Sequence, residues 1–113
     1  MSMTMSPLPD MRVRLDSQPC AEIVRVSGEI DVLTMGPLMT VFDEAFATGA
    51  PVIVADLVDV DFIDSSGLSG LLGLHRRLER QRRQLVIAAS SEVRRVVELA
   101  ALDQLLQLTD ERP

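Results

Sequence analysis

Two short segments of uninterrupted apolar residues constrain the fold of this chain more than any other feature of its sequence. Residues 52–55 and 85–89 lack the alternation of apolar and polar residues that marks a strand with one solvent-exposed face. The stretch between them shows helical spacing at Leu68, Leu71, Leu72, His75 and Leu78. A buried strand, a helix and a second buried strand predict parallel strands with helices packed against their sheet.

The flanking segments predict a hairpin and two further helices. Residues 11–16 and 21–26 alternate apolar and polar residues around a turn at Gln18-Pro19, which is typical of paired antiparallel strands. A helix capped by Thr34 is expected to bury Leu38, Val41, Phe42 and Ala45. A helix capped by Ser90 or Ser91 is expected to bury Val93, Val96, Val97 and Ala100.

The expected order is therefore β-β-α-β-α-β-α, with a further edge strand at residues 105–108. Strands that alternate with helices predict a mixed central sheet in a single α/β domain. We expect this domain over residues 11–110, with residues 1–10 as a disordered lead-in. Three glycines of the central helix recur every third residue and are expected to let it approach the sheet closely: Gly67, Gly70 and Gly73.

Charge and composition argue against nucleic acids and membranes as partners. The net charge is −6 and aromatic residues make up 3% of the chain, so phosphate backbones and anionic lipids would be repelled and bases would find few stacking partners. The apolar runs are too short to span a bilayer and the N-terminus does not resemble a signal peptide, which predicts a cytoplasmic protein. One group of basic residues predicts a solvated helix face: Arg76, Arg77, Arg80, Arg82 and Arg83.

The chain lacks the residues that common catalytic and metal sites require. It has one His, one Cys and no Lys, so a closed zinc site and a Walker lysine are excluded within the chain. His75 lies on an apolar helical stripe, where a core or boundary residue is expected rather than a general base. Cys20 predicts a buried thiol on a strand. We expect no catalytic residue, no metal site, no cofactor and no enzymatic activity.

The most informative motif is Asp64-Ser65-Ser66-Gly67-Leu68, where a strand passes into a helix. A serine in this place can cap the helix by accepting a backbone N–H bond from its first turn, which is a structural role. A helix N-terminus is also where a phosphate is tolerated best, because free N–H groups and the helix dipole face it. An exposed serine there could be phosphorylated without unfolding the domain.

Together with Gly28-Glu29-Ile30-Asp31 at the end of an earlier strand, this motif resembles the STAS domain of bacterial anti-sigma factor antagonists. The resemblance extends from Cys20 to about Thr109. It includes the central strand at residues 52–57 and the strand and helix at residues 84–88 and 91–102. It implies a STAS-like fold of the same element order.

The resemblance also implies a mechanism. Antagonists of this family bind an anti-sigma factor that is also a serine kinase with a histidine-kinase-like ATPase fold, which frees the sigma factor. The kinase modifies the serine directly after the aspartate, here Ser65 with Ser66 as the alternative, and a PP2C-type phosphatase reverses the modification. The partner-binding residues that it implies are Asp31, Thr34, Asp64, Ser65, Ser66, Gly67 and Leu68.

A second function remains open for the same domain. STAS domains also serve as assembly subunits of transport complexes, such as lipid-transport ABC systems, without a phosphorylation switch. The intact Asp-Ser-Ser sequence at residues 64–66 favours the antagonist, because an assembly subunit need not keep a phosphate acceptor. Ser69 stands where many antagonists have glycine. We further expect the Asp31 loop and the Asp64 turn to lie side by side as an acidic docking edge.

Overall fold

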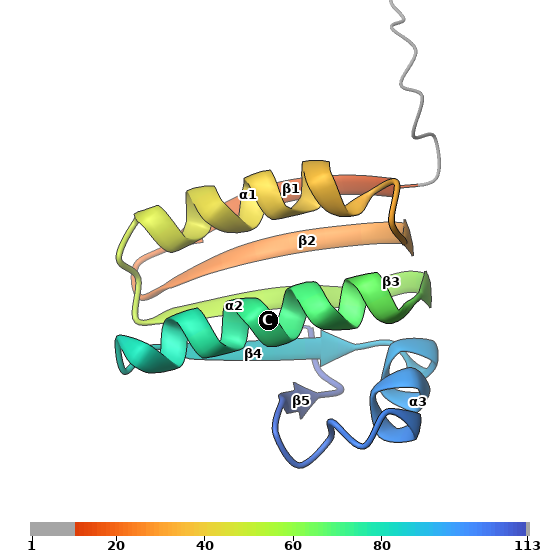
Figure 1. Ribbon diagram of the computed structural model, residues 1–113. Coiled ribbons are helices and arrows are strands. Elements are labelled where there is room, and N and C mark those ends of the chain that lie inside the picture. The colour runs from red at the N-terminus through yellow and green to blue at the C-terminus, as the bar shows by residue number, and fades with distance from the viewer. Residues whose placement is uncertain (1–10, 113) are drawn as a thin grey trace, which may run out of the picture.

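The computed structural model, which describes residues 11–112, contains one five-stranded sheet and three helices (Figure 1). The elements follow one another as β1 (Met11–Gln18), β2 (Ala21–Ile30), α1 (Met35–Ala47), β3 (Val52–Ile63), α2 (Ser65–Arg80), β4 (Gln84–Ala89), α3 (Ser91–Leu99) and β5 (Gln107–Thr109). The predicted α/β class and element order are confirmed. The lead-in predicted for residues 1–10 lies outside the described part of the chain.

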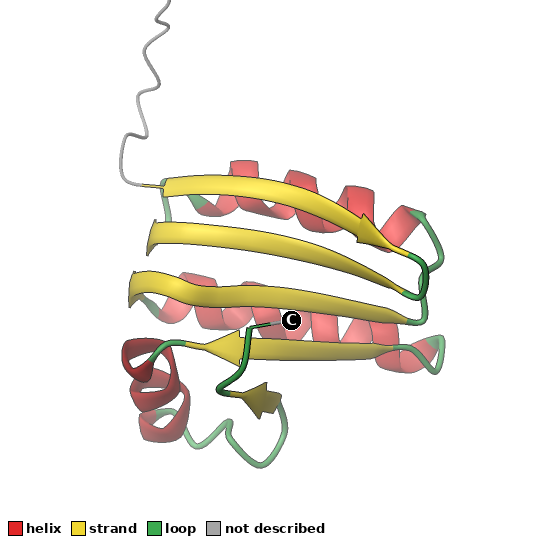
Figure 2. Cartoon of the chain, turned by 180° about the vertical axis from the view of Figure 1, so that it is seen from behind, coloured by secondary structure: helices red, strands yellow, loops and turns green. Residues whose placement is uncertain are grey.

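The strands lie in the sheet in the order in which they occur in the chain. β1 pairs antiparallel with β2, whereas β2 with β3, β3 with β4 and β4 with β5 pair in parallel. α1 and α2 cover one face of the sheet, and α3 lies at its end beside β4 (Figures 1 and 2). Because β2, β3 and β4 are parallel, their carboxyl ends share one edge, and all three helices begin there.

The central strand β3 is buried over the segment that its unbroken apolar sequence predicts to be covered on both faces. Every residue from 53 to 57 is buried, so the absence of alternation did indicate a strand shielded on both faces. One member of this run is not apolar. The Asp56 side chain is only 3% exposed, and it is neutralised by Nη1 of Arg25 at 2.8 Å.

The helix α2 uses a different apolar stripe from the one predicted. Leu68, Leu71 and Leu78 are buried as expected, but the third turn buries Leu74, whereas Leu72 is only partly buried against the core. The glycine prediction holds in part. A side chain on Gly67 would meet Ile63 and Ile30 of the sheet, whereas Gly70 faces α1 and Gly73 has open space around it.

Two local predictions are wrong, and a third is right except for its bounds. Cys20 is exposed, because the hairpin reverses at this position and the residue belongs to the turn rather than to a strand. Ala100 is exposed, because α3 ends at Leu99 and the chain leaves the helix through Ala101 at φ 61°. The last edge strand exists, but it starts two residues later than predicted, at Gln107.

The basic group at the end of α2 is only partly a solvated face. The guanidinium groups of Arg77 and Arg83 lie 4.3 and 4.6 Å from the ring centroid of Phe46 on α1. Arg83 also donates to the carbonyl oxygens of Phe46 at 3.0 Å and Ala50 at 2.8 Å. It therefore satisfies carbonyl groups at and just beyond the C-terminus of α1 and ties the segment after α2 to them, whereas Arg77 connects α2 itself to α1.

Candidate functional site

The turn between β3 and α2 is organised by Asp64 rather than by a serine. Oδ1 of Asp64 accepts hydrogen bonds from the backbone N–H groups of Ser66 at 3.0 Å and Gly67 at 3.1 Å. It also accepts one from the Ser66 hydroxyl at 2.6 Å. Asp64 is thus the N-cap of α2, and capping by a serine at this position is corrected.

The electrostatics of the turn favour a charged Asp64. The hydrogen bond from the Ser66 hydroxyl, reinforced by the N–H groups of Gly67 and Ser66, holds the pKa of Asp64 below its ordinary value despite partial burial. The carboxylate also lies at the positive end of the helix dipole. Asp64 therefore adds a fixed negative charge beside the two serines.

The two serines of the motif have different environments. Ser65 is the first residue of α2 and is exposed, and its hydroxyl forms no hydrogen bond with any residue from 11 to 112. The Ser66 hydroxyl, by contrast, is held by Asp64 and is half-buried. Of the two, Ser65 has the hydroxyl that an approaching protein can reach.

A second acidic turn follows β2. Oδ1 of Asp31 accepts hydrogen bonds from the backbone N–H groups of Leu33 at 2.9 Å and Thr34 at 3.1 Å. The Thr34 hydroxyl accepts from the Asp31 N–H at 2.8 Å and donates to the Glu29 carbonyl at 3.0 Å. Thr34 occupies the N-cap position of α1, but its side chain makes no capping hydrogen bond and instead braces the loop.

The sheet brings these two turns together. Ile30 and Ile63 are paired at the ends of β2 and β3, and the N–H of Asp64 donates to the Ile30 carbonyl at 3.1 Å. Asp31 and Asp64 therefore follow neighbouring strand ends, which confirms that the two loops lie side by side. The close fit of Gly67 against Ile30 and Ile63 locks the start of α2 to both strands.

The predicted partner-binding residues fall into two groups. Ser65 is exposed, and Asp31, Asp64 and Ser66 are half-buried, so these four can face a partner. Thr34, Gly67 and Leu68 are buried, with Thr34 only 3% exposed. The buried three can act only by holding the exposed residues in place, because the surrounding core excludes a partner from them.

Exposed apolar side chains also occur at this edge of the sheet, and the sequence did not predict them. Val32 and Leu33, in the loop after Asp31, are 73% and 67% exposed, and Phe62, next to the end of β3, is 44% exposed. Exposed large apolar side chains at the edge of a sheet are candidate contacts for another protein, and Val32 and Leu33 lie next to each other in one loop. The available signal was an apolar pair in a loop between a strand end and the start of a helix.

Other candidates for chemistry do not form a site. The His75 side chain is 17% exposed, and its Nε2 lies 3.9 Å from Glu79 and has no hydrogen-bond partner within the described residues. Among residues 11–112, no cluster of His, Cys, Asp or Glu side chains is suited to a metal ion. Within the same range, no helix has the length and apolar character to cross a membrane.

The sequence model of the STAS domain matches residues 12–112. The chain belongs to the STAS domain family. This STAS domain is 30% identical over 86 residues to the anti-sigma-F factor antagonist RsfB of Mycobacterium tuberculosis, across 76% of this chain and 70% of RsfB. It is 28% identical over 88 residues to the anti-sigma-B factor antagonist of Staphylococcus aureus, across 77% of this chain and 82% of that protein.

A solved structure with a similar fold also comes from an anti-sigma factor antagonist. The crystal structure of an anti-sigma factor antagonist from Mycobacterium paratuberculosis superposes with a TM-score of 0.81 at 27% identity, covering 94% of this chain and 90% of that one. This STAS domain therefore belongs with the anti-sigma factor antagonists, which are regulatory proteins and not enzymes.

Proposed function

We propose that this STAS domain binds an anti-sigma factor and that phosphorylation of Ser65 breaks the complex. The proposed partner is a serine kinase with a histidine-kinase-like ATPase fold, and its capture by the antagonist frees a sigma factor. The observation that carries the proposal is the exposed Ser65 hydroxyl at the start of α2, beside the Asp31 loop.

Three features support Ser65, rather than Ser66, as the acceptor. Its hydroxyl is exposed and makes no hydrogen bond with residues 11–112, whereas the Ser66 hydroxyl would first have to leave Asp64. Ser65 is also the first helical residue, where a new phosphate meets the positive end of the dipole. Loss of the Ser66 hydrogen bond would further weaken the cap of α2.

The binding surface that we propose combines charge with apolar contact. Val32 and Leu33 supply exposed apolar area, while Asp31, Asp64 and Ser65 supply polar groups beside it. An apolar centre with a polar rim is the usual composition of a protein interface. Basic groups of the kinase would face the two aspartates and steer the association.

The proposed switch acts on the complex and leaves the fold intact. The kinase transfers the γ-phosphoryl group of ATP to Ser65 Oγ, releasing ADP and the hydroxyl proton, which places up to two negative charges next to Asp64. Closing an interface over these like charges is expected to cost roughly 3–4 kcal/mol, or a few hundredfold in affinity. A PP2C-type phosphatase would restore the hydroxyl by hydrolysis and release inorganic phosphate.

The test begins with capture of partners from a lysate of the source bacterium by wild-type, Ser65→Ala and Ser65→Asp proteins. Wild type and Ser65→Ala should recover an ATPase-fold anti-sigma factor, and Ser65→Asp should recover less of it. With ATP, that partner should modify wild type at Ser65 and leave Ser65→Ala unmodified. Titration of the unphosphorylated and the phosphorylated wild-type protein against the partner then measures the loss of affinity.

Ser91 provides a matched control, because it is also an exposed first residue of a helix that is capped by the residue before it. Ser91→Ala and Ser91→Asp should bind as wild type, and Ser91→Ala should be modified like wild type. Modification that persists in Ser65→Ala but is lost in Ser66→Ala would move the acceptor to Ser66. Equal affinity of the two forms would remove the switch and favour the assembly-subunit function.

A further inference from the structure

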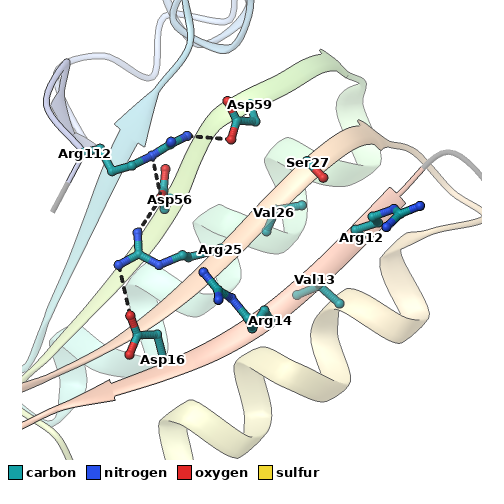
Figure 3. Close-up of a pocket in the computed structure, with 10 residues that line it drawn as sticks. All are labelled: Arg12, Val13, Arg14, Asp16, Arg25, Val26, Ser27, Asp56, Asp59 and Arg112. Carbon is teal, nitrogen blue, oxygen red and sulfur yellow. Dashed lines mark hydrogen bonds and ion pairs between the residues drawn. The ribbon is translucent and has the colours of Figure 1, made fainter.

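The sheet face turned away from α1 and α2 carries a pocket that the proposed function does not use. It has a volume of about 570 Å³ and lies over β1, β2 and β3 (Figure 3). Arg12 pairs with Ser27 across β1 and β2, and Arg14 pairs with Arg25, so these side chains line one surface. A pocket of this size is in the range of sites for small molecules.

The acidic groups of the pocket are already neutralised. Arg25 pairs with Asp16 at 3.0 Å and with Asp56 at 2.8 Å. Arg112, which reaches over β3 from the end of the described chain, pairs with Asp56 at 3.1 Å and with Asp59 at 2.6 Å. The three aspartates of the lining are therefore engaged by two of its arginines.

Within residues 11–112 the other two arginines of the lining form no ion pair, although Arg14 also attracts the Asp16 carboxylate, whose pKa is lowered mainly by the hydrogen bond from Arg25. Arg12 and Arg14 lie two residues apart on β1, both are exposed, and neither forms an ion pair or side-chain hydrogen bond with any residue from 11 to 112. Figure 3 shows their guanidinium groups pointing in different directions, but both side chains are long and exposed and can turn toward a phosphate, which accepts several charge-assisted hydrogen bonds. The chain as a whole carries a net charge of −6, so attraction of an anion here would be local to this pocket.

The other residues that line the pocket indicate which further chemical groups the bound anion would have. The Ser27 hydroxyl and the Asp59 carboxylate can both hydrogen-bond to ligand hydroxyl groups. Among the described residues that line the pocket there is no aromatic ring for a base to stack on, and the side chains of Val13 and Val26 point to the opposite, core-facing side of β1 and β2. We propose that the pocket binds a small phosphorylated polyol of the sugar-phosphate class, with its phosphate on Arg12 and Arg14 and its hydroxyls at Ser27 and Asp59.

Ribose 5-phosphate, inorganic phosphate and ribose are the probes for this site. Binding to the full chain is measured by calorimetry and by amide chemical-shift changes in nuclear magnetic resonance. Ribose 5-phosphate should bind more tightly than either fragment, with shifts confined to β1, β2 and the region of Asp59. The double variant Arg12→Gln/Arg14→Gln should weaken the binding of ribose 5-phosphate about tenfold or more. Ser27→Ala should weaken it by a few fold and leave the binding of inorganic phosphate unchanged.

The matched control is Arg76→Gln/Arg80→Gln, which removes two exposed charges from α2, outside the pocket. This control variant should bind ribose 5-phosphate with an affinity within about twofold of wild type. Thermal melts should confirm that every variant is folded. Binding that survives the loss of Arg12 and Arg14, or shifts that map elsewhere, would overturn the site. Inorganic phosphate that binds as tightly as ribose 5-phosphate would overturn the assignment to a phosphorylated polyol, and no binding of any probe would overturn the proposal.

Discussion

Three consecutive residues have different roles at the start of α2. Asp64 caps the helix, Ser66 holds the cap through its 2.6 Å hydrogen bond, and Ser65 between them is exposed. The sequence was sufficient to select this motif, because a polar run between a buried strand and an apolar helix marks a turn. It was not sufficient to assign the cap, since aspartate and serine are equally good N-caps and only the backbone path decides between them.

The cap makes a pH-dependent contribution to stability. Because folding lowers the pKa of Asp64, its contribution is complete above the unfolded pKa of about 4 and is lost as the pH falls through the folded value. Asparagine also caps but does not titrate in this range. The difference in thermal midpoint between wild type and Asp64→Asn should therefore be larger at pH 7 than at pH 3 in circular dichroism melts.

A control for this comparison is Asp103→Asn, because Asp103 is exposed and makes no side-chain hydrogen bond or ion pair within residues 11–112. Its effect on the thermal midpoint should differ little between the two pH values. A wild-type advantage over Asp64→Asn that grows on acidification would contradict the assigned role of the carboxylate.

The end of α3 stores strain at a single residue. Ala101 has φ 61°, a left-handed conformation that costs a residue with a side chain roughly 1–2 kcal/mol. Glycine avoids this cost but loses more entropy on folding, so Ala101→Gly should raise the free energy of unfolding by about 0.5–1 kcal/mol in urea titrations. Ala100→Gly, at φ −84°, relieves no strain and should lower it by about 0.5–1 kcal/mol. Equal effects of the two changes would contradict this account.

At the scale of elements, the sequence predicted every strand and helix but not every helix face. In α2, leucines lie at positions 68, 71, 72, 74 and 78, and spacings of three and four residues allow more than one stripe. Packing against both the sheet and α1 selects Leu74 over Leu72. The buried Asp56 was also missed, because its partner Arg25 lies on another strand and no local pattern connects them.

The glycines of α2 provide a direct test of its packing. A Cβ on Gly67 would lie 2.6 Å from Cγ1 of Ile63 and 2.8 Å from Cγ2 of Ile30, so Gly67→Ala should lower the free energy of unfolding by roughly 1–3 kcal/mol. Gly73 has open space around it within the helix, so Gly73→Ala should raise stability by up to about 1 kcal/mol. Urea denaturation of both variants measures the contrast, and a harmless Gly67→Ala would show that α2 is not locked to the strand ends.

At the scale of the molecule, two surfaces with different chemistry lie on different parts of one sheet. The carboxyl edge of β2 and β3 presents Asp31, Ser65 and exposed apolar side chains, whereas the open face carries the arginine-lined pocket. The sequence predicted the first surface as acidic only. Its apolar part was not predicted, because whether a leucine is exposed or buried depends on the path of the loop, which the sequence alone does not show.

That apolar part should matter for partner binding. We expect Leu33→Ser to weaken the complex with the captured anti-sigma factor about tenfold or more, because this large exposed apolar side chain would lose its contact with the partner. Leu99→Ser is the matched control, since Leu99 is 76% exposed but lies on α3. Surface plasmon resonance on both variants measures the difference. Equal affinities would show that the docking edge relies on its charges alone.

The placement of Ser65 beside buried Gly67 and Leu68 has a consequence for how such regulators diversify. A bacterium that contains several related antagonists and kinases must prevent crosstalk between the pairs. Here the residues that maintain the fold point inward, while Val32, Leu33, Ser65 and Ser69 lie on the surface and contribute little to the core. After gene duplication, a few surface substitutions could therefore stop each copy from binding the partner of the other. None of the intermediate sequences would need to lose the stability of the fold.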